Sequence, residues 1–236
     1  MRTVTFNIQH GAKGLDAVAE FVDGLVPDIV FLQEVDRGCR RSGGVDQVAD
    51  LATRLTLEWA FAEAFPFDGG SFGVAILSRS PLANVRSIGL PHPSPRRHDG
   101  TGEPRVLLTA RLGSLTVATT HLGLSAAERI DQARKIRETL ESMGPVILGG
   151  DLNEGPNGGV LTRWSGWLAD SFRQAGGGEI RTGPPDRPDA RIDFILHSAG
   201  APTPNAAIIG PWGASDHRAV IVDFAQAGLA AASGSL

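Results

Sequence analysis

Six short polar segments follow or interrupt apolar runs of the chain, and they hold the side chains that could do chemistry. The segments cover residues 5–11, 31–36, 119–124, 149–157, 191–196 and 215–217. Just beyond or within expected strands they place Asn7, Glu34, His121, Asp151, Asn153, Asp193, Asp216 and His217. Carboxylates, amides and imidazoles in this setting are the ingredients of a site that binds a hard divalent cation and hydrolyses phosphate esters.

The apolar run DIVFLQ ends at Glu34, where an unpaired buried carboxylate would be costly. Mg²⁺ prefers oxygen ligands and keeps several waters, so one or two carboxylates are enough to bind it. Glu34 is therefore a candidate metal ligand, and the alternative is a salt-bridged residue at the end of a strand. Asn7 ends an apolar strand in the same way, but an amide there can equally close a turn.

The motif GGDLN, residues 149–153, follows the apolar run VIL. Its two glycines allow a close approach of the backbone, and Asp151 and Asn153 then project from one side of an extended segment. A carboxylate here can orient or deprotonate water, and an amide can hold a phosphate oxygen. The alternative is an Asx turn that only ends the strand.

Two histidines complete the candidate site. Asp193 could orient His217, as a carboxylate orients an imidazole in other hydrolytic sites. Asp216, beside this histidine, could bind a metal directly or through water. His121 follows an expected strand and could stabilise negative charge. Either histidine alone could be structural, and it is the joint pattern that indicates hydrolytic chemistry.

Apolar periodicity predicts the elements that must position these residues. Helices are expected at 15–26, at 44–57, from a capping box of Ser125 and Glu128 to Gly144, and near 158–168. Strands are expected at 2–8, 28–33, 73–79, 104–112, 114–120, 145–150, 191–197, 206–210 and 218–224. Strands outnumber helices without strict βαβ order, which predicts an α/β fold of two packed sheets with helices outside. Residues 1–225 are expected to form one domain, and residues 226–236 a flexible tail.

Composition limits the function classes. The chain has 236 residues, 42% of them hydrophobic, which suffices for one large core and excludes a disordered polymer. No run of about 18 apolar residues is present, so stable membrane insertion is not expected. The N-terminus turns polar within six residues and lacks the apolar stretch of a secretory signal, which favours a cytoplasmic protein. A net charge of −4 is mild evidence against a general duplex-DNA binder, and no obligate protein partner is evident.

As a set, and in this order, the motifs from Asn7 to His217 resemble those of the endonuclease/exonuclease/phosphatase superfamily. This superfamily includes deoxyribonuclease I, abasic-site endonucleases, neutral sphingomyelinases, deadenylases and inositol-polyphosphate 5-phosphatases. The resemblance covers nearly the whole chain and implies a four-layer α/β sandwich, in which two packed mixed sheets are flanked by helices and the site lies at one end of the sheets. The segments RGCRRSGGVDQ, FGVAILSR and EPRVLL resemble the small bacterial metal-dependent hydrolases of this superfamily.

The resemblance implies that Glu34 is the principal metal ligand, with Asn7 and Asp216 completing the metal and water shell. The implied ion is Mg²⁺ or Mn²⁺, with Ca²⁺ as a further candidate, since oxygen-rich sites accept all three. The implied reaction is hydrolysis of a phosphodiester or phosphomonoester by metal-assisted in-line attack of water.

The resemblance also implies catalytic roles. Asp151 activates or aligns the attacking water, and Asn153 holds the phosphate. His217, oriented by Asp193, contacts the phosphate and stabilises the transition state or acts as acid and base. His121 matches the second histidine of the family, near the leaving group. Members of the superfamily differ over the general base, so Asp151 and His217 both remain candidates.

Three arginines are candidates to bind the substrate phosphate or a second anionic group: Arg37, Arg41 and Arg105. The alternative for each is a solvated loop residue. The start NIQHG departs from the NVNG-like start of abasic-site endonucleases, and GGDLNEG and ASDHR replace the signatures of the 5-phosphatases. A DNA or RNA nuclease of the same superfamily is the alternative function, although a chain with 6% aromatic residues shows no evident stacking platform.

Two other function classes are weighed against this one. Residues 69–73 fit the G-x-S-x-G pattern of serine hydrolases. A nucleophile elbow needs a helix after the serine, however, and here a strand is expected to follow. A catalytically silent binding protein is a remote alternative, because all eight positions of the candidate site are filled.

Overall fold

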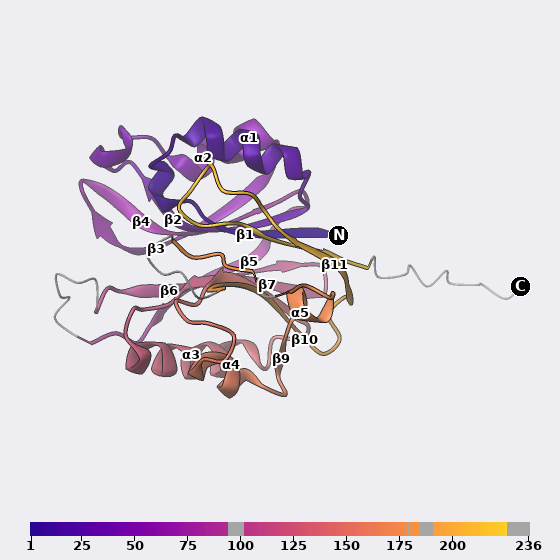
Figure 1. Ribbon diagram of the computed structural model, residues 1–236. Helices are drawn as coiled ribbons and strands as arrows, with labels where there is room; N and C mark the ends of the chain where they lie inside the picture. The colour runs from indigo at the N-terminus through magenta and orange to yellow at the C-terminus, as the bar shows by residue number, and fades with distance from the viewer. Residues whose placement is uncertain (94–101, 179, 185–190, 226–236) are drawn as a thin grey trace, which may run out of the picture.

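Two six-stranded β-sheets pack face to face in the computed structural model, which describes residues 1–93, 102–178, 180–184 and 191–225 (Figure 1). The first sheet has the strand order β11-β12-β1-β2-β4-β3. Its strands are β1 (Arg2–Asn7), β2 (Ile29–Arg37), β3 (Glu58–Phe67), β4 (Gly70–Ser78), β11 (Pro204–Ile209) and β12 (Val220–Phe224). Strands β1 and β2 are parallel, and the other neighbours in this sheet are antiparallel.

The second sheet repeats this pattern with the strand order β5-β6-β7-β8-β10-β9. Its strands are β5 (Ala83–Leu90), β6 (Arg105–Leu112), β7 (Leu115–His121), β8 (Val146–Asp151), β9 (Leu168–Asp170) and β10 (Asp193–Ser198). Here β7 and β8 form the parallel pair, and the other neighbours are antiparallel. Both sheets are therefore mixed, with a parallel pair at the centre of each.

Helices cover the outer faces of the sheets, so that the molecule has four layers (Figure 1). Helices α1 (Leu15–Leu25) and α2 (Gln47–Leu55) lie on the first sheet, and α3 (Ala126–Leu140) and α4 (Gly159–Trp164) on the second. The short α5 (Ser171–Gln174) contacts β10 and β11. Helix α1 buries Val18, Ala19 and Val22, the spacing of one helical face, and ends at Val26 in the left-handed conformation.

The apolar run of β2 contributes to two hydrophobic cores. Val30 and Leu32 pack in the core under the outer helices, whereas Ile29 and Phe31 pack between the sheets. Successive side chains of a strand point to opposite faces, so one continuous apolar run can serve both layers. A Cβ atom on Gly149 of β8 would lie 2.1 Å from Cδ2 of Phe31. The first glycine of GGDLN therefore leaves the space that this ring fills between the sheets.

The predicted α/β fold, with two packed mixed sheets and helices outside, is confirmed. Three strands that were not predicted, β3, β5 and β9, lie at the edges of the sheets. The helix expected near 158–168 ends at Trp164 as α4, and β9 begins at Leu168. Many side chains of β3 and β5 are exposed, so the apolar alternation that marks a half-buried strand is weak there.

Helix α3 begins at Ala126, after Ser125, but not through the predicted cap. The predicted capping box is wrong, because Ser125 makes no side-chain cap hydrogen bond and Glu128 instead accepts one from the backbone N–H of Gly102. The expected tail, residues 226–236, lies outside the described residues. None of the helices in the described part of the chain combines the length and apolar composition needed to cross a bilayer.

Candidate active site

The predicted site residues gather at one end of the two sheets. Asn7, His121 and Asp151 are the last residues of β1, β7 and β8, and Asp193 is the first residue of β10. The pairing register puts His121, Asp151 and Asp193 in one row across β7, β8 and β10. Residues directly opposite each other in a sheet have neighbouring side chains. Strand pairing thus brings an imidazole and two carboxylates together.

Glu34 reaches the site from the first sheet through a β-bulge. The pairing of β2 with β4 shifts between Leu32 and Val35, and Glu34 has a φ of 56°. Left-handed backbone costs a residue other than glycine about 1–2 kcal/mol, so the surrounding structure must hold it in place. Nδ2 of Asn7 donates to Oε1 of Glu34 at 2.9 Å and to Oδ2 of Asp151 at 3.2 Å, which links the carboxylates of the two sheets.

Asn7 hydrogen-bonds to carboxylates of both sheets. Its amide nitrogen faces Glu34 and Asp151, and its Oδ1 accepts a hydrogen bond from the backbone N–H of Gln9 at 3.0 Å. In this arrangement Asn7 positions the two carboxylates.

Glu34 itself is held as an anion. Burial alone would raise its pKa, but the imidazole of His10 and the positive potential of the nearby histidines, together with the amide of Asn7, lower the pKa to about 2. A carboxylate that stays charged at neutral pH is suited to bind a cation.

A cavity of about 400 Å³ lies at this end of the sheets. Six of the eight predicted side chains line it: Glu34, His121, Asp151, Asn153, Asp216 and His217. The other two, Asn7 and Asp193, are fully buried and hydrogen-bond to Glu34 and His217 respectively. All eight residues therefore belong to one site.

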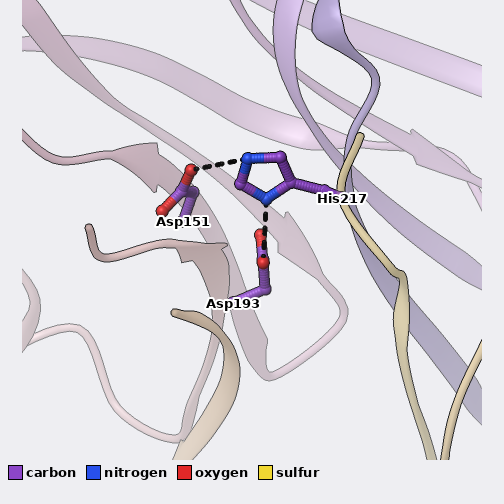
Figure 2. A group of neighbouring side chains, drawn as sticks. All are labelled: Asp151, Asp193 and His217. Atoms are coloured by element: carbon purple, nitrogen blue, oxygen red, sulfur yellow. Dashed lines mark hydrogen bonds and ion pairs between the residues drawn. The ribbon is translucent and has the colours of Figure 1, made fainter. Parts of the chain in front are cut away.

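His217 lies between two carboxylates (Figure 2). Its Nδ1 is 3.0 Å from Oδ2 of Asp193, and its Nε2 is 3.8 Å from Oδ2 of Asp151. Burial alone would lower the pKa of His217, but these carboxylates raise it to about 10. Burial and the charge of Asp193 in turn raise the pKa of Asp151 above its usual range. The three side chains each present a donor atom within 4.8 Å of the others, a spacing that a metal ion could also use.

Asn153 and His121 contact each other and Asp151. Nδ2 of Asn153 lies 3.0 Å from Nε2 of His121 and donates to the carbonyl of Leu122 at 2.8 Å. The backbone N–H of Asn153 donates to Oδ1 of Asp151 at 2.8 Å, which is an Asx turn at the end of β8. Nε2 of His121 is 3.4 Å from Oδ2 of Asp151. The turn therefore has a role in the site, because it fixes the amide against the histidine.

Ser215 attaches the segment SDH to the first sheet. Its hydroxyl donates to the carbonyl of Asn7 at 2.7 Å and accepts from the backbone N–H of His217 at 3.2 Å. Nζ of Lys13 donates to the carbonyl of Ser215 at 2.7 Å. These bonds bring Asp216 to the cavity that Glu34 also lines.

The three candidate arginines differ in their placement. Arg41 and Arg105 line the cavity. Arg37 is not among the lining residues, because its guanidinium binds Asp46 at 2.6 Å and stacks 5.1 Å above the ring of Trp59. Only Arg41 and Arg105 are therefore placed to meet a substrate.

Arg41 and Arg105 are both held by carboxylates. Arg41 donates through Nε and Nη2 to fully buried Asp36, both at 2.8 Å, and Nη2 of Arg105 is 3.1 Å from Oε2 of Glu103. Arg105 is only 5% exposed, and its Nε is buried without a hydrogen-bond partner among the described residues. A buried cation at the wall of the cavity is suited to an anionic ligand.

Eight residues of the cavity wall were not predicted from the sequence: His10, Phe65, Phe67, Phe72, Glu103, Leu124, Pro184 and Ile192. The phenylalanines flank the turn between β3 and β4, and their close spacing in residues 65–72 is a signal that could have identified an aromatic hairpin. His10 lies in the same motif as Asn7 but received no role. The G-x-S-x-G pattern also falls on this hairpin, where Ser71 lies in strand β4 without the helix that a nucleophile elbow needs.

Comparison with known proteins identifies the family. The model of the Endonuclease/Exonuclease/phosphatase family matches residues 4–217, whereas no curated protein matches the chain. An endonuclease/exonuclease/phosphatase from Beutenbergia cavernae has 25% identity and a TM-score of 0.73, over 94% of this chain and 70% of that one.

Two further solved structures have the same fold. A functionally unknown conserved protein from Enterococcus faecalis has 21% identity and a TM-score of 0.76, over 95% of this chain and 99% of that one. The human Nocturnin catalytic domain with bound sulfate anion has 20% identity and a TM-score of 0.72, over 95% of this chain and 93% of that one. With the family match over nearly its whole length, the chain belongs to the endonuclease/exonuclease/phosphatase family.

Proposed function

We propose that residues 1–225 form a single catalytic unit that hydrolyses a phosphodiester or phosphomonoester with the help of a divalent cation. One observation supports this most strongly. The carboxylates of Glu34, Asp151 and Asp216 line one cavity together with His217, which is itself paired to a buried carboxylate. This combination offers anions for a cation and an imidazole for the charge of a transition state.

The side chains fit a hard divalent ion such as Mg²⁺ or Mn²⁺. Glu34 is held as an anion at the cavity wall, and Asp216 lines the same cavity. We assign the ion to Glu34 and Asp216, because the pKa of His217 in the alternative group is raised to about 10, and a protonated imidazole has no lone pair for a metal. When bound there, the ion would neutralise phosphate oxygens and polarise the ester.

The remaining residues supply orientation and proton transfer. Asp151 has a raised pKa, so it is suited to align a water molecule and accept its proton. His217, kept as a cation by Asp193, is suited to stabilise the charge that develops on the phosphate. His121 and Asn153 face the same cavity, where they are suited to hold the phosphate and the leaving oxygen. Arg41 and Arg105 are suited to bind further anionic oxygens of the substrate.

A nuclease of the same family is the second candidate. The observation that favours it is the aromatic wall of Phe65, Phe67 and Phe72, on which a base could stack. A silent binding protein is disfavoured, because buried charges and strained backbone are retained where the hydrolytic chemistry would need them.

The test is a metal-dependent assay on the full chain. Substrates are bis-p-nitrophenyl phosphate, p-nitrophenyl phosphate, abasic DNA, plasmid DNA and RNA, each with Mg²⁺ or Mn²⁺ and with EDTA. We expect cleavage that EDTA abolishes, and that Glu34→Gln lowers by at least about 10³-fold, since several kcal/mol of charge stabilisation are lost. The matched control is Glu138→Gln, an exposed carboxylate on α3. Full activity in Glu34→Gln, or in EDTA, would contradict the metal assignment.

A further inference from the structure

His10 is a titratable residue of the cavity wall to which neither the sequence motifs nor the proposed reaction gives a role. It lies in a short 3-10 turn, Gln9–Gly11, that follows β1 after one residue, Ile8. Nε2 of Gln47 donates to its backbone carbonyl at 2.7 Å, and its ring lines the cavity beside Glu34. The first sheet and helix α2 therefore both fix the position of this imidazole.

The backbone at this turn is strained. Gln9 and His10 have φ values of 48° and 46°, a left-handed pair without a glycine. Such residues persist only where their surroundings hold them, and they cluster at ligand-binding and active sites. Gln9 is held by the hydrogen bond from its N–H to Oδ1 of Asn7, and His10 by Gln47. With the backbone in this conformation, the ring of His10 faces Glu34.

The ring nitrogen that faces Glu34 is unsatisfied. Nδ1 of His10 is buried, has no hydrogen-bond partner among the described residues, and lies 3.9 Å from Oε2 of Glu34. This separation is too long for a hydrogen bond. An octahedral cation with bonds of about 2.1 Å holds adjacent ligands about 3 Å apart and opposite ligands about 4 Å apart. The two atoms are therefore spaced as two ligands of one ion would be.

We propose that His10 is a nitrogen ligand of the divalent cation that Glu34 binds, so that this chain prefers a first-row transition ion such as Mn²⁺ to Mg²⁺. The inference rests on the proposed function, because it needs the cation at Glu34. Magnesium takes oxygen ligands almost exclusively, whereas an imidazole nitrogen suits transition ions. A ligand set in which the nitrogen of His10 joins the oxygen of Glu34, with Asp216 binding directly or through water, would therefore differ in selectivity from one made of oxygen alone.

The experiment measures metal binding and not turnover. Mn²⁺ and Mg²⁺ affinities of the full chain are determined by calorimetry, and pulsed EPR of bound Mn²⁺ detects nitrogen coupling in protein labelled with [¹⁵N]histidine and in unlabelled protein. The test variant is His10→Asn, because asparagine tolerates a left-handed backbone and has no imidazole. The matched control is His92→Asn, an exposed histidine outside the cavity wall.

We expect histidine nitrogen coupling in the wild type and in His92→Asn, and its loss in His10→Asn. The Mn²⁺ affinity should fall about tenfold or more in His10→Asn, by analogy with the loss of groups that support a metal site, while the Mg²⁺ affinity changes little. His10→Gly, which has no side chain to strain at this φ, gives the same comparison in a second variant should His10→Asn unfold.

Two outcomes would overturn the inference. Unchanged nitrogen coupling and Mn²⁺ affinity in a folded His10 variant, with metal binding lost in Glu34→Gln, would remove His10 from the ligand set and leave the proposed function intact. Unchanged metal binding in both the His10 and the Glu34 variants would contradict the proposed function as well.

Discussion

Two buried histidines at opposite ends of strand β10 show how differently the fold treats one residue type. His217 is 5% exposed beside Asp193, the first residue of the strand, and His197 is 7% exposed near its other end. Carboxylates raise the pKa of His217 to about 10, against the effect of burial. Burial lowers the pKa of His197, whose Nδ1 lies 2.8 Å from the hydroxyl of Ser171. Two histidines of similar exposure therefore differ, because nearby carboxylates outweigh the effect of burial at His217, whereas burial outweighs the charge of Asp170 at His197.

The backbone conformation also differs between the site and the rest of the molecule. Among the described residues, eight other than glycine have a positive φ: Gln9, His10, Val26, Glu34, Thr56, Asp68, Asn84 and Asn153. Val26 and Thr56 end helices, where a left-handed residue is ordinary. Four of the eight lie in the site motifs, and three of those line the cavity. Strained backbone and buried charged groups thus lie together at one end of the sheets, which is where a binding site needs them.

The largest expected effect comes from replacing the carboxylate of Asp193, beside His217, with a neutral amide. Asp193→Asn should lower kcat by about 10³- to 10⁴-fold, because the neutral amide neither holds the imidazolium nor fixes its tautomer. The pKa of His217 should fall toward the usual range of histidine. Histidine NMR titration and steady-state kinetics on the full chain measure the two effects.

Ser171→Ala is the control for this prediction, since it removes the partner of His197 at the other end of β10. It should leave both kcat and the titration of His217 unchanged. If Asp193→Asn and Ser171→Ala gave the same kinetics, the contrast between the two ends would have no functional meaning.

The second expected effect is on stability, in the apolar layer behind the site. Gly149→Ala would place a methyl group against Phe31, and overpacking of this kind costs about 2–3 kcal/mol in the free energy of unfolding. Urea unfolding measures the loss. Gly89→Ala in edge strand β5 is the matched control, because a Cβ atom there meets nothing within 4 Å. Phe31→Leu should restore part of the stability of Gly149→Ala, and equal stability of the two alanine variants would contradict the close packing of the sheets.

Much of this site could be predicted from the sequence, because its residues stand at the ends of apolar strands. Asp151 ends a run that must be buried, and the pairing of β8 with β7 and β10 follows from the fold. The bulge at Glu34 was not predictable, since it depends on a register shift against β4 and not on the local pattern. Edge strands β3 and β5 were missed for a related reason, as strands that bury few side chains leave little apolar periodicity.

The arginines show a second limit of the sequence. Arg37 and Arg41 lie in one polar segment, and nothing in their spacing distinguishes them. Their directions are set by which aspartate each one binds, Asp46 outside the cavity or buried Asp36 beside it. Such choices depend on contacts between distant elements, which a pattern along the chain does not contain.

The third prediction tests this difference between the arginines. Arg41→Ala should lower kcat/KM by about 10- to 100-fold, the usual effect of losing a hydrogen bond from a charged group to the substrate. Arg37→Ala should leave kcat/KM nearly unchanged, because Arg37 does not line the cavity. Steady-state kinetics on the substrate that the screen identifies provides the measurement. Equal losses in the two variants would place the substrate outside the cavity.

The smallest expected effect concerns His197 and pH. Its pKa is lowered in the folded chain, so the unfolded chain binds more protons as pH falls below the ordinary histidine pKa of about 6.5. The stability that a neutral His197 contributes is therefore present at pH 7 and is lost on acidification through this window.

His197→Gln should remove this part of the acid dependence. Subtracting the unfolding free energies of the variant from those of the wild type, between pH 7 and pH 5, isolates the contribution of His197 from other titrating groups. His92→Gln, an exposed control, should keep the slope of the wild type. His217 cannot produce the slope, because its raised pKa makes its contribution complete below about pH 6.5 and removes it only as pH rises through about 10. If the difference in unfolding free energy between the wild type and His197→Gln did not change with pH, burial would not penalise the charge of His197. The contrast between the two ends of β10 would then depend on Asp193 alone.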